Sequence, residues 1–266
     1  MSVSSNSPDV SGVVELSGVA DVESGAVRSS VRIVGPGRAG RALAAALRSA
    51  GWRVEPMVGR GDPVRSSAAG VAFCVIAAPD DGVAEIAASI EPVNSTTLVH
   101  LSGSLAPDVL GAHERRGAMH PLVSLTGEGS AGALQGAYFA VSGDPGVEVL
   151  VAALGGRSVP VAAHERMAHH AACCVAANHL VTLMAQVERL APAGVPLEAY
   201  LDLARGAIQN VERLGPAGAL TGPAVRGDET TIAGHLAAMP ATERELYTAM
   251  LEATRTLAAA GETPTS

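Results

Sequence analysis

The chain of 266 residues contains no lysine, because all 18 of its basic residues are arginines. A Schiff base, a P-loop phosphate site and a lysine general acid each require a lysine amine, so the sequence excludes all three. Aromatic residues are also scarce, at 2% of the chain, while hydrophobic residues make up 48%. The core must therefore consist mainly of Ala, Val and Leu, and side chains this small favour close packing of helices.

Long apolar runs and paired cysteines are missing as well. No run approaches the roughly 20 apolar residues that span a bilayer, and the first residues, MSVSSNSPDV, lack the basic and apolar regions of a secretory signal. The net charge of −8 argues against a general affinity for nucleic acid or anionic membranes. The cysteines, Cys74, Cys173 and Cys174, are spaced for neither a disulfide framework nor a zinc site. We therefore expect a cytoplasmic protein without a metal.

The first half of the chain has the pattern of an α/β protein. Residues 1–29 are rich in Ser, Gly, Val and acidic residues without a sustained period, which predicts a disordered tail. Short β-like runs then alternate with helical or turn segments, and this alternation predicts a Rossmann-type, mostly parallel sheet over residues 30–162. The segment between the second and third runs is too short and broken for a full helix. The predicted strands are 31–34, 53–58, 71–77, 97–101, 118–120, 137–141 and one near 158–161.

The second half, residues 163–266, has the pattern of an all-helical domain. Its first stretch is long, favourable for helix and free of proline until Pro192. Amphipathic segments follow at 196–214 and 242–260, and Asp228 is a candidate cap for one more helix. We expect this half to bind the substrate and to form a dimer.

The stretch Gly35-Pro36-Gly37-Arg38-Ala39-Gly40 matches the pattern G-x-G-x-x-G. It follows a predicted strand and opens a predicted helix, which is the context that a dinucleotide-binding loop requires. In such a loop the first glycine permits the tight turn, the second admits the pyrophosphate and the third packs the helix on the strand. The sequence therefore predicts a phosphate cradle made of these six residues.

The end of the second predicted strand indicates which dinucleotide is bound. An NAD site usually has an acidic residue about 20 positions beyond the glycines, where this chain has Arg60. A guanidinium suits the 2′-phosphate of NADP(H) through paired hydrogen bonds, and Arg38 can approach the same phosphate. Asp62 provides the alternative, because a shifted strand end would make it a ribose ligand. NADP(H) is thus favoured over NAD(H).

Six motifs follow one another along the chain: GPGRAG, AAPDD (Ala77–Asp81), HLSGSL (His100–Leu105), AMHPL (Ala118–Leu122), AANHL (Ala176–Leu180) and ALTGPAVRGDETT (Ala219–Thr231). The ordered set resembles the superfamily of 6-phosphogluconate dehydrogenase, ketopantoate reductase and pyrroline-5-carboxylate reductase. Within it, the chain is most similar to compact oxidoreductases that join a Rossmann-like domain to a helical C-terminal domain of unknown function.

The resemblance implies roles for several residues. Ala78 and Pro79 would contact the cofactor, and Ser102 and Gly103 would lie beside the nicotinamide and substrate in a cleft between the domains. His120 and the proline after it are similar to a His-Pro pair of prephenate-type dehydrogenases, where the histidine faces substrate. The segment GDETTIAGHLAAM is similar to a segment of pyrroline-5-carboxylate reductases whose threonines bind the substrate carboxylate.

The chain departs from this superfamily at one catalytic position. Ketopantoate reductases and 6-phosphogluconate dehydrogenases carry K-x-x-x-N on the long helix, where the lysine assists proton transfer. Asn178 matches the asparagine, but Cys174 occupies the lysine position. Proton delivery must therefore come from another group.

Histidine is the natural proton donor near neutral pH. His120 is the first candidate because it ends a strand on the presumed cleft side, and His170 is the second. With helical spacing, His170, Cys174 and Asn178 form an i, i+4, i+8 stripe. A partly buried helix histidine that bonds to backbone is an equal interpretation of His170.

Four further residues are candidates for substrate contacts. Asn178 can orient a substrate oxygen, with a buried amide that joins helices as the alternative. Arg226 can bind a carboxylate through two hydrogen bonds, and Thr221 offers a hydroxyl. Asp228 either orients Arg226 or caps the following helix. Cys173 and Cys174 are expected to be packing residues, because no base lies close to them in the sequence.

These observations predict an NADPH-dependent reductase of a small keto acid, with ketopantoate as the candidate that the resemblance favours. An imine reductase of the pyrroline-carboxylate type is the first alternative, since an imine can bind already protonated. A non-catalytic NADP-binding sensor or scaffold is the second, although the sequence has no output module. The expected partners are a small-molecule carboxylate substrate and a second copy of the chain in a homodimer.

Overall fold

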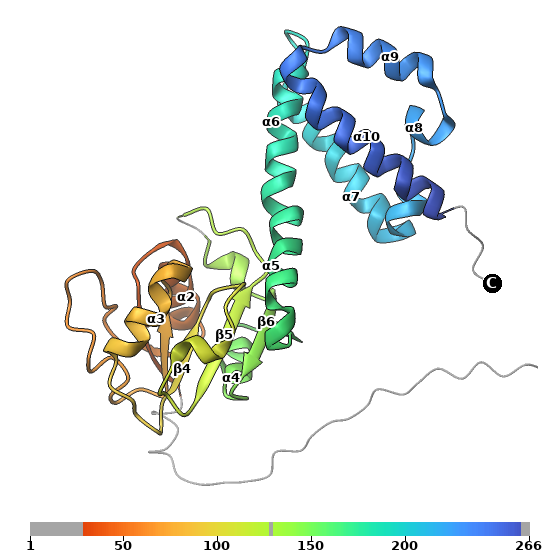
Figure 1. Ribbon diagram of the computed structural model, residues 1–266. Helices are drawn as coiled ribbons and strands as arrows, with labels where there is room; N and C mark the ends of the chain where they lie inside the picture. The colour runs from red at the N-terminus through yellow and green to blue at the C-terminus, as the bar shows by residue number, and fades with distance from the viewer. Residues whose placement is uncertain (1–28, 128–129, 262–266) are drawn as a thin grey trace, which may run out of the picture. The chain divides into compact units, whose positions relative to one another are not determined.

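The computed structural model describes residues 29–127 and 130–261, which divide after Cys173 into two compact units (Figure 1). The tail predicted for residues 1–29 lies outside the described residues, apart from Ser29. A mostly parallel sheet with its helices forms the first unit, and helices form the second. The predicted fold class, a Rossmann-type domain followed by a helical one, is confirmed.

Seven strands of the first unit form one sheet in the order β2-β1-β3-β4-β5-β6-β7. Neighbouring strands are parallel except for β5 and β6, which are antiparallel. The carboxyl ends of β1, β3, β4 and β5 therefore lie at the same edge of the sheet. The strands are β1 (Ser30–Val34), β2 (Arg53–Val54), β3 (Phe73–Ile76), β4 (Thr97–His100), β5 (Arg116–Pro121), β6 (Tyr138–Gly143) and β7 (Arg157–Pro160).

The edge strand β2 is shorter than predicted. Only Arg53 and Val54 pair continuously with β1, and a single bridge from Val34 to Val58 extends the contact. No helix forms between β2 and β3 in this fully described segment, as the sequence predicted. One guanidinium nitrogen of Arg32 instead donates hydrogen bonds to the carbonyl oxygens of Ser66, Ser67 and Ala69, at 2.9–3.2 Å. A side chain of β1 thus organises a connection that has isolated turns but no helix.

Helices cover both faces of the sheet, because both sides of its strands are apolar. Alternate residues such as Phe73 and Val75 pack in a cluster with α2 (Arg38–Ser49) and α4 (Val147–Ala153). Their neighbours Cys74 and Ile76 pack with α3 (Asp80–Ser89) on the other face. Three short 3₁₀ turns complete the connections: η1 (Pro107–Leu110), η2 (Gly132–Leu134) and η3 (Ala163–Glu165).

Helix α5 (Arg166–Cys174) begins a long helical stretch. By length and composition alone, the stretch Ala163–Leu190 is apolar enough to cross a membrane, which corrects our expectation that no segment approaches this limit. Core helices of proteins without membrane spans meet the same criterion. Arg166, in its first turns, is fully buried and bonded to residues of the first unit. These bonds favour a protein environment for the start of the helix.

The second unit consists of helices, as predicted. A π-helical turn, η4 (Val175–His179), leads into α6 (Leu180–Leu190), α7 (Leu197–Ala219), α8 (Pro223–Arg226), α9 (Glu229–Ala238) and α10 (Ala241–Gly261). Gly215, with a φ of 72°, breaks the regular helix of α7 just after the predicted end at Leu214. A positive φ of this kind favours glycine, and the following Pro216 cannot continue the backbone hydrogen bonding.

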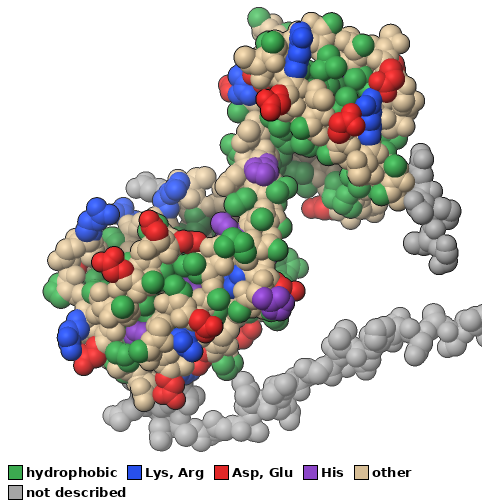
Figure 2. Space-filling view, in the orientation of Figure 1, with side chains coloured by type: hydrophobic (Ala, Val, Ile, Leu, Met, Phe, Trp, Pro, Cys, Tyr) green, Lys and Arg blue, Asp and Glu red, His purple; other side chains and the backbone are tan. Residues whose placement is uncertain are grey.

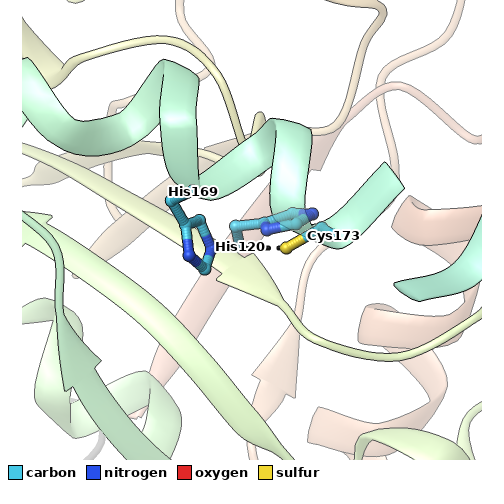
Figure 3. A group of neighbouring side chains, drawn as sticks. All are labelled: His120, His169 and Cys173. Atoms are coloured by element: carbon cyan, nitrogen blue, oxygen red, sulfur yellow. Dashed lines mark hydrogen bonds between the residues drawn. The ribbon is translucent and has the colours of Figure 1, made fainter. Parts of the chain in front are cut away.

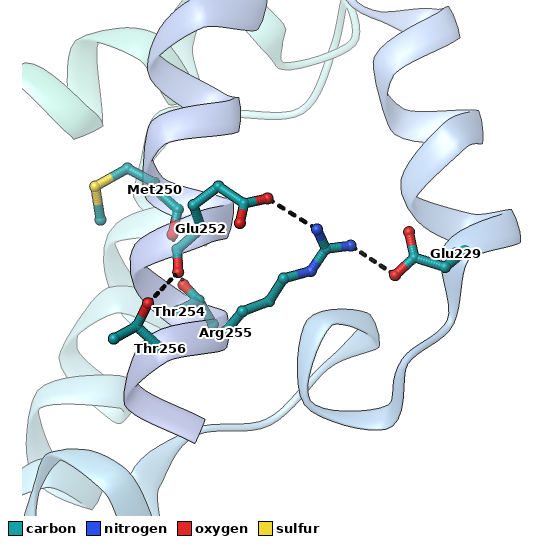
Figure 4. A network of polar contacts seen from close by, with 6 residues as sticks. All are labelled: Glu229, Met250, Glu252, Thr254, Arg255 and Thr256. Atoms are coloured by element: carbon teal, nitrogen blue, oxygen red, sulfur yellow. Dashed lines mark hydrogen bonds and ion pairs between the residues drawn. The ribbon is translucent and has the colours of Figure 1, made fainter. Parts of the chain in front are cut away.

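Arginine–glutamate pairs join the helices of the second unit. Arg189 of α6 binds Glu243 of α10 through two hydrogen bonds of 2.6 and 3.0 Å. Arg255 of α10 bridges Glu252 on its own helix and Glu229 of α9 (Figure 4). Hydrophobic side chains also reach the surface of this unit between scattered charges (Figure 2); examples are Val181, Leu203, Ile208, Val211 and Leu214.

We expect Gly40→Ala to destabilise the protein far more than Gly37→Ala. A Cβ at Gly40 would lie 2.1 Å from the carbonyl oxygen of Gly35, whereas a Cβ at Gly37 would meet no atom within 4 Å. Overpacking of this kind costs about 1–3 kcal/mol, while alanine at the helix cap position costs about 1 kcal/mol or less. Urea denaturation followed by circular dichroism measures both losses. Equal losses would contradict the close packing of Gly40.

Candidate functional site

The glycine loop has the geometry that its pattern predicted. Gly35 has a φ of 109°, and a Cβ there would lie 2.3 Å from the carbonyl oxygen of Ala77, at the end of β3. Gly40 packs against Gly35 itself, and Gly37 alone has open space beside it. The first and third glycines thus hold α2 close to the sheet, while the second leaves room for a ligand to approach the backbone.

An open pocket lies at the start of α2. It is lined by Pro36, Gly37, Arg38, Arg41 and Gly127. The helix has no side-chain cap and no acidic residue in its first turn. Exposed backbone N–H groups, the helix dipole and two arginines therefore favour an anion such as a phosphate group. The sequence pattern did not single out Arg41, although its i, i+3 spacing from Arg38 places both side chains on one helix face.

The loop that follows β2 packs on the glycine loop. The bridge from Val34 to Val58 brings Gly59 beside Pro36, and Gly59 N–H donates a 2.7 Å hydrogen bond to Oδ2 of Asp62. One carboxylate oxygen of Asp62 is thus engaged within its own turn. Arg60, between them, is exposed next to the cradle.

The loops after β3 and β4 are tied to each other. Pro79 caps α3 directly after Ala78, and the hydroxyl of Ser104 donates a 2.5 Å hydrogen bond to Asp80 in the first turn of that helix. The hydroxyl of Ser102 accepts hydrogen bonds from the backbone N–H groups of Ser104 and Leu105, at 3.2 and 3.1 Å. Ser102 is also buried, so its hydroxyl shapes the loop from inside.

Three predicted residues, Gly103, His120 and His170, come together in the first unit. A Cβ on Gly103 would lie 2.8 Å from Cε1 of His120 and 2.7 Å from Cδ2 of His170. The two imidazole rings are 6.0 Å apart between centroids and inclined at 72°. Glycine is therefore required at this position, because the loop after β4 passes directly against both rings.

His120 is neutral at pH 7. Burial, assisted by the neighbouring His169, His170 and Arg166, lowers the pKa of His120 to about 4. Among the described residues, no group forms a hydrogen bond with its buried Nδ1. A neutral imidazole can donate a hydrogen bond to a substrate atom, but it is not the charged acid that an ordinary histidine pKa suggested.

Arg166 is the main residue of the site that the sequence did not reveal. Its side chain is fully buried and donates hydrogen bonds to the Ser102 carbonyl oxygen, at 2.6 Å, and to the Ser142 hydroxyl, at 3.1 Å. It forms no ion pair within residues 29–127 and 130–261. The positive charge of the buried guanidinium lowers the pKa of His100 and His120, and the negative charge of Asp80 offsets part of this effect. The sequence contains only a weak indication of this role, namely the position of Arg166 one helical turn before His170.

His169 was also not predicted as a site residue. It lies between Arg166 and Cys173 on α5, and its ring meets that of His120 at a centroid distance of 6.0 Å and an angle of 85°. Cys173, which the sequence assigned to packing, lies 3.5 Å from Nε2 of His169. The end of β5 therefore faces a set of polar side chains on one helix.

The remaining predicted residues lie in the second unit. Asn178 belongs to the π-helical turn η4, so the α-helical stripe expected from His170 through Cys174 to Asn178 is interrupted at Val175. Thr221 lies just before the short helix α8, and Arg226 is the last residue of that helix. Asp228 caps α9: its two carboxylate oxygens accept hydrogen bonds from the N–H and hydroxyl of Thr231, at 3.0 and 2.7 Å. The capping alternative for Asp228 is thus confirmed, while the contribution of these residues to a substrate site stays a prediction.

Residues 138–254 match DUF2520, a domain of unknown function. This match includes the last strands of the sheet as well as most of the helical unit, and it confirms the predicted resemblance to proteins whose C-terminal domain is of unknown function. No curated protein matches the chain.

Solved structures share the fold of the chain. A provisionally named NADP oxidoreductase, BF3122 from Bacteroides fragilis, is 21% identical with a TM-score of 0.73, over 86% of this chain and 98% of that one. A reductive aminase from Aspergillus terreus, in complex with NADPH and ethyl-5-oxohexanoate, is 16% identical with a TM-score of 0.66, over 84% and 92%. A pyrroline carboxylate reductase from Plasmodium falciparum with NADP bound is 12% identical with a TM-score of 0.57, over 87% and 99%. Identities this low establish a common fold.

We expect the pH dependence of stability to reflect the neutral His100. Burial and Arg166 lower its pKa from 6.5 to about 4 in the folded state, so the unfolded chain binds the proton more tightly. The stabilisation of the folded protein by neutral His100 is complete above pH 6.5 and is lost as the pH falls through 4. The full loss in the free energy of unfolding is about 3 kcal/mol, at about 1.4 kcal/mol per pKa unit, and most of it is reached by pH 4.5. Urea denaturation of the wild type and His100→Gln between pH 7.5 and 4.5 measures it, and identical pH slopes would refute this role of His100.

Proposed function

We propose that the protein is an NADPH-dependent reductase that transfers a hydride to the C=O or C=N carbon of a small carboxylate. The observation that carries this proposal is the pairing of two features at one sheet edge. The glycine loop leaves an open, arginine-lined approach at Gly37, and the loops from neighbouring strands bring Gly103 against His120 and His170. In open α/β sheets, ligands bind outside the carboxyl ends of the strands.

The residues of the cradle fit a dinucleotide. We assign the pyrophosphate to the backbone N–H groups at the start of α2, with Arg38 and Arg41 beside it. Arg60 is assigned to the 2′-phosphate, because it is exposed while Asp62 bonds to its own turn. When bound, NADPH supplies the hydride. Ala78 and Pro79, beside the glycine loop at the end of β3, would form the adjoining wall of this site.

The chemistry of the substrate side follows from the absence of lysine and from the neutral His120. A neutral imidazole has one N–H and one acceptor nitrogen, so it can donate a hydrogen bond to a carbonyl oxygen or accept one from the N–H of a protonated imine. His170 is the second group in position to do so. Arg226 and Thr221 stay the candidates for the substrate carboxylate, because a guanidinium can bind it through two hydrogen bonds and a hydroxyl can add a third.

An imine is the substrate class that a neutral His120 supports better than a keto acid. An imine can enter the site protonated, so it needs only orientation from the protein before hydride transfer. A keto acid such as ketopantoate, the first prediction from the sequence, must gain a proton on oxygen during its reduction. The low pKa of His120 makes that donation less favourable at pH 7. The reductive aminase and the pyrroline carboxylate reductase among the structural neighbours support the preference for an imine over a keto acid.

The spacing of the cysteines suits no disulfide framework and so agrees with a reducing compartment. Burial also raises the pKa of the Cys74 thiol to about 12, so this thiol stays protonated. We therefore retain the cytoplasm as the proposed location.

Replacing Arg60 with Asp should weaken NADPH binding by about 10- to 100-fold and leave NADH binding little changed, because charge-assisted hydrogen bonds to a phosphate contribute about 1.5–3 kcal/mol. Fluorescence titration with each dinucleotide measures the difference. Arg65→Asp is the matched control, since Arg65 is exposed in the same connection and pairs with Glu91. A similar loss for NADPH and NADH would show that Arg60 does not contact the 2′-phosphate.

A turnover assay tests the proposed reductase activity directly. NADPH consumption is measured with 1-pyrroline-5-carboxylate, ketopantoate and other branched 2-keto acids, and we expect the cyclic imine to be the best substrate. His120→Ala should lower kcat by about 100-fold or more with NADPH affinity preserved, whereas the exposed His164→Ala should change neither. Tight NADPH binding without turnover of any of these compounds would contradict the proposed reductase.

A further inference from the structure

Three side chains with metal-binding atoms converge in the first unit: His120 of β5 and His169 and Cys173 of α5 (Figure 3). One ligand atom from each residue lies within 4.8 Å of those of the other two. All three residues are partly buried, so their positions are fixed by packing while solvent can still reach them.

The backbone explains why they meet. His169 and Cys173 are four residues apart in a regular helix, so their side chains project from the same face in successive turns. His120 approaches that face from the sheet, with its ring almost perpendicular to that of His169. The set is therefore built from one strand and one helix, both of which are rigid elements.

The spacing fits a tetrahedral ion. Zinc lies about 2.0–2.1 Å from imidazole nitrogen and about 2.3 Å from thiolate sulfur, which places two such ligands about 3.6 Å apart at a tetrahedral angle. The Sγ of Cys173 lies 3.5 Å from Nε2 of His169. Two ligands thus already have the separation of a coordinated pair, and the third comes from the facing strand.

We propose that His120, His169 and Cys173 bind one divalent ion of the zinc type. Two imidazoles and a thiolate are the ligand set that such borderline-soft ions prefer. Three protein ligands leave a coordination position for a group from outside the protein, which is the pattern of catalytic rather than structural zinc sites. The fully buried Arg166 directs its hydrogen bonds to Ser102 and Ser142, but its charge opposes a cation, so the affinity should be below that of a four-ligand structural site.

The position of this site gives it a chemical consequence. His120 borders Gly103, the residue that the proposed function places beside the substrate. An ion held there would take the place of the hydrogen bond from His120, as a Lewis acid for a carbonyl oxygen or an unprotonated imine nitrogen, in a chain that has no lysine. This role rests on the proposed reductase function, whereas the binding of the ion does not.

The proposal departs from the expectation of no metal. That expectation rested on the cysteine spacing, and the adjacent Cys173 and Cys174 do not form a ligand pattern within one segment. The set becomes visible only when β5 and α5 are brought together by the fold.

Metal titration of the untagged, chelator-treated full chain tests the site without cofactor or substrate. We expect one equivalent of Co²⁺ to bind with the visible bands of tetrahedral cobalt and a thiolate-to-cobalt charge-transfer band, and Zn²⁺ to displace it. Cys173→Ser should abolish the charge-transfer band, and Cys173→Ser and His169→Asn should each weaken Zn²⁺ binding by about 100-fold or more. Cys174→Ser and His164→Asn, matched controls from the same helical stretch, should retain wild-type binding.

Circular dichroism and thermal melting of each variant establish that it is folded. Substoichiometric binding to the wild type, or equal weakening by Cys173→Ser and Cys174→Ser, would overturn the proposed site. Since no NADPH is present, stoichiometric metal binding by a chain that reduces none of the substrates would sustain the site and reject only the reductase function.

Discussion

The hydrogen bond from Arg166 to the carbonyl oxygen of Ser102 is the interaction on which the candidate site depends. It joins the start of α5 to the loop after β4, although the two segments are far apart in the sequence. Because the guanidinium is fully buried and has only neutral acceptors, its charge acts on the nearby histidines with little screening. The same contact helps to fix the loop in which Gly103 passes against His120 and His170. One arginine thus sets both the shape and the electrostatics of this region.

The glycine cradle could be predicted because its information is local. A strand, a turn and a helix follow one another within a few residues, and the steric roles of Gly35 and Gly40 involve only these elements and the adjoining end of β3. The meeting of Gly103 with His120 could be anticipated from topology, since the ends of neighbouring parallel strands lie at one sheet edge. The strand order beyond that point, including the antiparallel pair of β5 and β6, required the structure.

The features that the sequence did not reveal depend on tertiary contacts or on local backbone geometry that leaves no pattern in the sequence. Hydrophobicity patterns place an arginine on the surface, whereas Arg166 is buried because the Ser102 carbonyl and Ser142 hydroxyl receive its N–H groups. Ser102 looked like a substrate contact, but its hydroxyl accepts two backbone hydrogen bonds from its own loop. The stripe through Asn178 assumed regular α-helix, and a π-helical turn has no comparable periodic signature.

The strand order of the first unit has a consequence for how the chain folds. The central strands β1, β3 and β4 pair in parallel with strands separated from them by a helix, by the connection that Arg32 holds or, for β4 and β5, by the loop that contains η1. Each such pairing closes a long loop before its contacts can form, and this entropy loss slows folding. The helices of the second unit gain their hydrogen bonds within a few residues and carry no such delay. The glycine loop therefore belongs to the unit that is synthesised before the helical unit and, by topology, is the slower to acquire its native pairings.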